Sequence, residues 1–220
     1  MQMLKIKDNH DDYIFTKILD IEDLNTRMIN RIENVEKTIK FNVRAETTFG
    51  DLHKYDEFSE FSKIVEEFVI ESSIKRNAEF PNHVERANHP VSIYTYNRQK
   101  TSALWAVRYQ SGDSTEQHDH WPSTWAWTYY IDPPKGCSGL YFPNADYEIK
   151  IEHGLLVVFS GSIIHEVKPS KFDGYRYCIT GTIDFEGYRG SLNKWIEDMP
   201  ESDREKYFNS IVSNPPQKVL

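Results

Sequence analysis

Apolar residues in the first part of the chain recur at spacings of three and four, which is the repeat of one face of an α-helix. One such stripe runs over residues 21–39, and Asp20 before it is a candidate helix cap. Its members are Ile21, Leu24, Met28, Ile32, Val35 and Ile39. A second stripe consists of Phe58, Phe61, Val65 and Phe68. We therefore predict a helical part over residues 1–80 whose two stripes are packing faces.

From about residue 90 to residue 186, short apolar and alternating runs are separated by Gly and Pro. Ala103, Trp105, Val107 and Tyr109 occupy every second position, so they share one face of a strand. The continuous apolar run 155–159 is typical of a strand that is buried on both faces. Further strands are predicted at residues 91–96, 125–131, 140–142, 163–165 and 175–185. Many short strands at spacings of about ten residues favour a double-stranded β-helix, a jelly-roll or cupin-like fold.

A charged, helical pattern returns at residues 190–212, where we predict C-terminal helices. A chain of 220 residues is long enough for one domain with its own core. The predicted organisation is a single mainly β domain over residues 1–220. Its core spans residues 90–186, and the N-terminal and C-terminal helices pack on that core.

Composition narrows the possible partners. The net charge of −8 argues against a broad electrostatic grip on nucleic acid. Cys137 and Cys178 are too few for a disulfide framework, which indicates a reducing compartment. No run approaches the roughly 18 apolar residues that a membrane span needs, and the polar N-terminus does not resemble a signal peptide. We expect a cytoplasmic protein that binds no membrane and does not bind nucleic acid over a broad surface, with a local basic groove left open.

Candidate chemistry centres on three histidines. His118 and His120 are two residues apart, so on one strand both imidazoles would point to the same face. A lone His-x-His motif is a weak signal. His165 strengthens it, because it follows a glycine turn in an apolar context where an unpaired imidazole would be costly. Three such ligands on one side of a metal would leave coordination positions open for oxygen and a co-substrate.

Arg176, on the last predicted strand, is a candidate site residue that is identified independently of the histidines. The residues at even positions of this strand, Arg176, Cys178, Thr180 and Thr182, form its more polar face. If that face looks into the barrel, Arg176 needs an anionic partner, because a buried unpaired guanidinium is very costly. Asp184 lies too far along the strand, so an external carboxylate held by the two prongs of the guanidinium would satisfy it. The alternative is that Arg176 faces solvent.

The segment from about residue 100 to residue 186 resembles the 2-oxoglutarate- and Fe(II)-dependent dioxygenases, in particular a phage-associated branch related to prolyl 4-hydroxylases. The resemblance rests on the order and spacing of HDH at 118–120, WTYYI at 127–131, GLYFP at 139–143, GLLVVF at 154–159, HEV at 165–167 and RYCI at 176–179.

The resemblance implies a double-stranded β-helix that uses Fe(II), molecular oxygen and 2-oxoglutarate, with ascorbate as a further candidate cofactor. Hydroxylation of a C–H bond would accompany conversion of 2-oxoglutarate to succinate and carbon dioxide. It implies that His118 and His165 bind iron, and that Arg176 holds the distal carboxylate of 2-oxoglutarate with help from Tyr130. It also makes a phage-encoded protein in the host cytoplasm an expectation.

One departure concerns the third ligand. The family motif is His-x-Asp, whereas the i+2 position here is His120. Asp119 would point to the opposite face of a regular strand, where it could accept a hydrogen bond from an imidazole. We favour His118, His120 and His165 as the metal-binding and catalytic set, with Asp119 as the alternative third ligand.

Other readings of the chain remain open. One is a cupin-like jelly-roll protein that binds a metal or a carbohydrate without oxygenase activity, and another is an assembly protein with a vestigial site. The substrate is unidentified, and peptidyl proline, a free amino acid, a nucleobase and a glycan are all candidates. Trp121, Trp125 and Trp127 are either packing residues or part of the mouth of the site. Residues 76–89 are either a lid or a simple linker.

Overall fold

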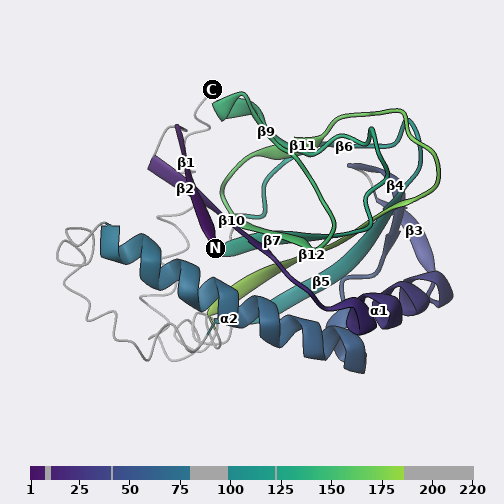
Figure 1. Ribbon diagram of the computed structural model, residues 1–220, viewed down its shortest axis with the longest axis horizontal. Coiled ribbons are helices and arrows are strands. Elements are labelled where there is room, and N and C mark those ends of the chain that lie inside the picture. Colours follow the sequence, from purple (N-terminus) through teal and green to yellow (C-terminus); the bar gives the residue numbers. More distant parts are fainter. Residues whose placement is uncertain (8–10, 41, 80–98, 122, 186–220) are drawn as a thin grey trace, which may run out of the picture. The chain divides into compact units, whose positions relative to one another are not determined.

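The computed structural model describes residues 1–7, 11–40, 42–79, 99–121 and 123–185 (Figure 1). Its elements are β1 (Gln2–Lys7), β2 (Asp11–Ile18), α1 (Glu22–Asn34), β3 (Lys37–Lys40), β4 (Val43–Thr48), a 3-10 turn (Leu52–Lys54), α2 (Asp56–Glu79), β5 (Gln99–Tyr109), β6 (Ser114–His118), β7 (Trp125–Ile131), β8 (Leu140–Phe142), a second 3-10 turn (Pro143–Ala145), β9 (Tyr147–Ile149), β10 (Leu155–Ser160), β11 (His165–Val167) and β12 (Arg176–Phe185). No helix in this described part is long and apolar enough to cross a membrane.

The strands form one 12-stranded sheet with the order β1-β2-β10-β7-β12-β5-β4-β6-β11-β8-β9, and β3 pairs with β4 beside this path. All ladders between these strands are antiparallel. The described part of the chain is therefore mainly β, with a curled antiparallel sheet and two helices that both precede β5. The predicted C-terminal helices at 190–212 and the predicted strand at 91–96 lie outside the described residues.

The prediction that residues 1–80 are helical is wrong for β1, β2, β3 and β4. The stripe over residues 21–39 continues beyond the end of α1 at Asn34, and Ile39 lies instead in β3 with 74% of its surface exposed. Asp20 does not cap α1 either, because the cap position is Ile21 and makes no side-chain cap bond. The second stripe is confirmed, since all four of its residues are completely buried in α2.

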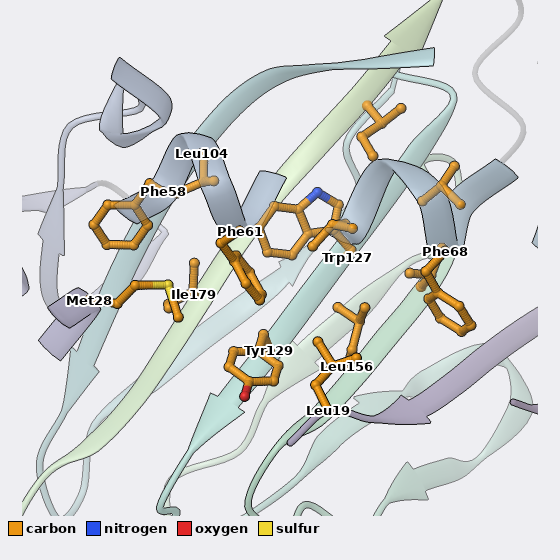
Figure 2. Close-up of a cluster of buried hydrophobic side chains, with 14 of the residues drawn as sticks. Leu19, Met28, Phe58, Phe61, Phe68, Leu104, Trp127, Tyr129, Leu156 and Ile179 are labelled. Atoms are coloured by element: carbon orange, nitrogen blue, oxygen red, sulfur yellow. The ribbon is translucent and has the colours of Figure 1, made fainter. Parts of the chain in front are cut away.

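The sheet has a packed core on each face. On one face, α1 and α2 cover a cluster that includes Met28, Phe61, Trp127 and Tyr129 (Figure 2). The Phe61 ring centroid lies 5.7 Å from that of Trp127 and 4.8 Å from that of Tyr129. Alternate residues of the same strands, among them Tyr130 of β7, join a second cluster on the opposite face. Every residue of β7 is consequently buried.

The predicted strand positions agree closely in the second half of the chain. The structure confirms the predicted bounds of β7 and β8, and the predictions for β10 and β12 are within one residue. β11 differs, because His165 begins this strand rather than ending one. Its pairing with β6 gives His165 a fixed neighbour, His118, directly across the ladder.

Candidate functional site

Three histidine side chains converge at the β6–β11 ladder. His118 is the last residue of β6, His120 follows two residues later outside any strand, and His165 is the first residue of β11. One ligand nitrogen from each lies within 4.8 Å of the other two. The ring centroid of His118 lies 4.3 Å from that of His165 and 5.0 Å from that of His120. The structure thus brings together the three imidazoles that the sequence singled out.

Backbone carbonyls fix the orientation of two of these rings. Nδ1 of His118 lies 2.8 Å from the carbonyl oxygen of Glu116, and Nδ1 of His165 lies 2.9 Å from that of Ile163. A carbonyl oxygen only accepts, so we assign the proton of each ring to Nδ1. This leaves the Nε2 lone pair of each ring available to a metal.

Burial keeps these two imidazoles neutral. It lowers the pKa of His118, and it holds the pKa of His165 well below its usual range with a further contribution from the neighbouring His118 and His120. A neutral imidazole is the form that binds a metal. At neutral pH, His118 and His165 are therefore in the neutral form that can bind a metal cation.

Asp119 does not join this cluster. Its Oδ1 accepts a hydrogen bond from the backbone N–H of Trp121 at 3.1 Å, which closes a short turn between the strands. Of the two alternatives for the third position, the structure brings His120 to the other histidines, and the Asp119 carboxylate stays outside the set.

A cavity of about 260 Å³ contains both the histidine cluster and Arg176. Arg176 is only 1% exposed, which rules out the alternative that it faces solvent. Its guanidinium carbon lies 4.8 Å from the ring centroid of Tyr109 and 5.3 Å from that of Tyr130. Cys178 and Thr180 line the same cavity, so the more polar face of β12, formed by its even-numbered residues, faces the interior as predicted.

Three polar atoms at the Arg176 end have no hydrogen-bond partner among the described residues. Nε and Nη2 of Arg176 and the hydroxyl of Tyr130 are buried and make no hydrogen bond within the described residues. Burial raises the pKa of Tyr130, so its hydroxyl remains a protonated donor. Unpaired buried donors of this kind are costly, and an anion between them would satisfy both groups.

The sequence did not single out Tyr109 or Thr115 for the site. Tyr109 pairs with Arg176 across the β5–β12 ladder, and its hydroxyl lies 2.6 Å from the Thr115 hydroxyl at the same end of the cavity. Tyr109 was recognised only as one of four residues on a strand face. The signal that could have identified it is the antiparallel register of β5 and β12, which places it opposite Arg176.

The tryptophans predicted near the site are distributed differently. Trp125 and Trp127 lie in the core beneath the helices, and Trp121 is 75% exposed. Trp105 lines the cavity instead, with its ring centroid 5.7 Å from that of His120. The first four residues of the predicted lid or linker, 76–79, end α2, whereas residues 80–89 and Pro122 lie outside the described residues.

No protein-family model matches the chain, and no curated protein matches it. Solved structures do match. The chain is similar to viral collagen prolyl hydroxylase vCPH from Paramecium Bursaria Chlorella virus-1 in its 2OG complex, with a TM-score of 0.52 and 15% identity over 77% of this chain and 94% of that chain. The chain has the fold of the 2-oxoglutarate- and Fe(II)-dependent oxygenases.

Two further matches agree. A prolyl-4-hydroxylase from Pseudomonas putida gives a TM-score of 0.54 and 13% identity over 79% of this chain and 93% of that chain. HygX from Streptomyces hygroscopicus, with nickel and 2-oxoglutarate bound, gives a TM-score of 0.52 and 7% identity over 80% of this chain and 83% of that chain. The predicted resemblance to this superfamily and to prolyl hydroxylases is confirmed at the level of the fold. The predicted phage-associated branch stays a prediction.

Proposed function

We propose that this protein is an Fe(II)- and 2-oxoglutarate-dependent oxygenase that hydroxylates a C–H bond of an organic substrate. One observation carries the proposal: a single cavity combines three convergent histidines with a buried arginine that has unpartnered donors. A cation-binding end and an anion-binding end in one cavity match the two ends of a chelating oxo-dicarboxylate.

The histidine set suits a first-row divalent metal. Three nitrogen donors from His118, His120 and His165 would leave the remaining positions of an octahedral ion open. When bound, Fe(II) supplies the activation of oxygen that is coupled to decarboxylation of 2-oxoglutarate. Because all three donors are neutral, the site retains the full double charge of the metal and favours an anionic co-substrate.

Arg176 suits the distal carboxylate of 2-oxoglutarate. Its guanidinium can donate two parallel hydrogen bonds to a carboxylate, and the Tyr130 hydroxyl can donate a third. Arg176 is 1% exposed, and the apolar side chains of Val107, Leu140 and Phe159 also line the cavity. In this setting a charge-assisted hydrogen bond is stronger than in water.

The cupin-like alternative accounts for the histidines alone. A protein that only bound a metal or a carbohydrate would not require a buried guanidinium with unused donors at the far end of the cavity. We therefore favour the oxygenase. Peptidyl proline is the first substrate to test, because prolyl hydroxylases are among the similar structures, and ascorbate is the reductant to include.

The test uses the intact protein without oxygen. Fe(II) and then 2-oxoglutarate are titrated anaerobically, and binding is followed by calorimetry and by the charge-transfer absorption of the chelate. We expect 2-oxoglutarate to bind only after the metal, and admission of oxygen to yield succinate. Binding of Fe(II) without any binding of 2-oxoglutarate would instead support the cupin-like alternative.

A further inference from the structure

Asp184 is a buried carboxylate near the end of β12. It is 8% exposed, and it makes no ion pair within the described residues. Its Oδ1 accepts a hydrogen bond from the backbone N–H of Thr124 at 3.0 Å, and its Oδ2 accepts one from the Ser123 hydroxyl at 3.3 Å. Both carboxylate oxygens are therefore committed to the segment that precedes β7.

That segment is hydrogen-bonded to the backbone of His120. The backbone N–H of His120 donates to the carbonyl oxygen of Gly161 at 2.7 Å, and the carbonyl oxygen of His120 accepts from the N–H of Ser123 at 2.8 Å. Gly161 in turn donates its N–H to the carbonyl of Thr124 at 3.1 Å. The backbone of His120 is thus tied on one side to Gly161 and on the other to the residue that Asp184 holds.

The other two histidines are positioned differently. His118 and His165 lie opposite each other in the β6–β11 ladder, and each ring is fixed by the carbonyl two residues before it. His120 has no such ladder position, since it lies beyond the end of β6. Its backbone is held by the bonds to Gly161 and Ser123, and these two residues pack so closely that a Cβ on Gly161 would lie 2.0 Å from the Ser123 carbonyl oxygen.

We propose that Asp184 is a positioning residue that holds His120 in place as the third metal-binding side chain. The inference rests on the metal site of the proposed function, but it does not depend on the oxygenase reaction. In this proposal β12 contributes at both of its ends. It begins with Arg176 in the cavity, and near its other end Asp184 holds Ser123 and Thr124.

The test measures Co(II) affinity of the full chain by calorimetry, together with the ligand-field absorption of the bound Co(II). Loss of a group that orients a ligand typically costs about 10- to 100-fold in metal affinity, and we expect a loss of that size for Asp184→Ala. Asp184→Asn keeps one acceptor oxygen and should lose less. Thr182→Ala is the matched control, because Thr182 is buried on the same face of β12 but its hydroxyl contacts Ser102.

A double-mutant cycle separates positioning from general stability. In a His120→Ala background, where only the weak residual binding of Co(II) by His118 and His165 is measured, Asp184→Ala should cause no further loss of affinity, because the ligand it positions is already absent. Equal losses in the two backgrounds, or unchanged affinity in Asp184→Ala, would overturn the inference. If Asp184→Ala does not fold, Asp184→Asn and Ser123→Ala are carried through the same cycle.

The outcomes also separate the two proposals. A wild-type protein that binds Co(II) but forms no succinate with Fe(II) contradicts only the oxygenase function, and the cycle still decides the role of Asp184. A wild-type protein that binds no divalent metal overturns both proposals.

Discussion

Arg176 and Tyr109 face each other across the β5–β12 ladder, with the guanidinium carbon 4.8 Å from the centre of the phenol ring. Burial raises the pKa of Tyr109 and of Tyr130, so both rings stay neutral. Their faces attract the cation, but they do not cancel its charge. The pair of rings therefore fixes the guanidinium in one orientation while its charge remains available to an anion.

The first prediction concerns that anion. Arg176→Ala should weaken 2-oxoglutarate binding by on the order of 2–5 kcal/mol, because it removes one partner of a buried charge pair. Arg176→Lys should recover only part of this, since lysine offers a point charge rather than a planar fork. Tyr130→Phe should cost about 0.5–1.5 kcal/mol, the usual net value of one hydrogen bond. Calorimetry on the anaerobic metal-loaded protein measures each value.

The control for this series is Co(II) affinity, which should be the same in all three variants because neither residue belongs to the histidine cluster. Equal 2-oxoglutarate affinity in the wild type and in Arg176→Ala would remove the co-substrate assignment.

The second prediction concerns the metal ligands. Replacement of His118, His120 or His165 by Ala should abolish tight binding of Fe(II) or Co(II), because each removes one of only three convergent donors. Asp119→Ala is the matched control and should bind normally, since its carboxylate caps the N–H of Trp121. The opposite pattern, with binding kept in His120→Ala and lost in Asp119→Ala, would make the aspartate the third ligand.

The third prediction tests the packing of the sheet. A Cβ on Gly181 would lie 2.5 Å from the carbonyl oxygen of Ala103 and 2.6 Å from the Trp127 ring. Gly181→Ala should therefore lower the free energy of unfolding by roughly 1–3 kcal/mol, the usual cost of overpacking. Gly50→Ala is the control, because its nearest contact would be an ordinary 4.0 Å to Ala103. Urea denaturation compares the two variants, and equal stability would argue against the close approach of β12 to β7.

The fourth prediction concerns pH. His153 Nε2 lies 2.5 Å from Glu22 Oε1, and its Nδ1 lies 2.6 Å from Asp132 Oδ1. Burial acts to lower the pKa of His153, but the hydrogen bond and charge of Glu22, together with those of Asp132, raise it overall. A raised folded-state pKa means that the folded protein holds this proton more tightly than the unfolded chain. The contribution to stability is complete below the unfolded value of about 6.5 and is lost as the pH rises through the folded value.

Denaturant unfolding at several pH values measures this effect. The difference between wild type and His153→Gln should be largest below about pH 6.5 and should shrink at higher pH. Its size should be about 0.5–1 kcal/mol, because both carboxylates are largely exposed and solvent screens the pairs. A difference that grows with increasing pH would contradict the assignment.

The sequence predicted those parts of the fold whose signal is local. The run from Trp125 to Ile131 is apolar or aromatic except at Thr128 and is buried on both faces of the sheet, and the stripe from Phe58 to Phe68 is the buried side of α2. The histidine cluster was also accessible, because two of its members are two residues apart. Arg176 was recognised because its strand alternates between polar and apolar faces.

Other parts depend on pairing between distant segments, which no local pattern reveals. β2 is a strand because it pairs with β10, with Phe15 opposite Val158, although a short apolar run alone does not distinguish strand from helix. Tyr109 and Asp184 acquire their roles only through the register of β12 with its neighbours. The phage-associated branch, the cytoplasmic location and the single-domain organisation over residues 1–220 stay predictions.

The alternation along β7 has a consequence for how this protein can change. Trp127 and Tyr129 face the helices (Figure 2), while Thr128 and Tyr130 line the cavity. Substitutions at Trp127 and Tyr129 act on folding stability alone, whereas substitutions at Thr128 and Tyr130 also change the lining of the cavity. The lining of the cavity can thus change while the helix-covered face of the same strand keeps its packing.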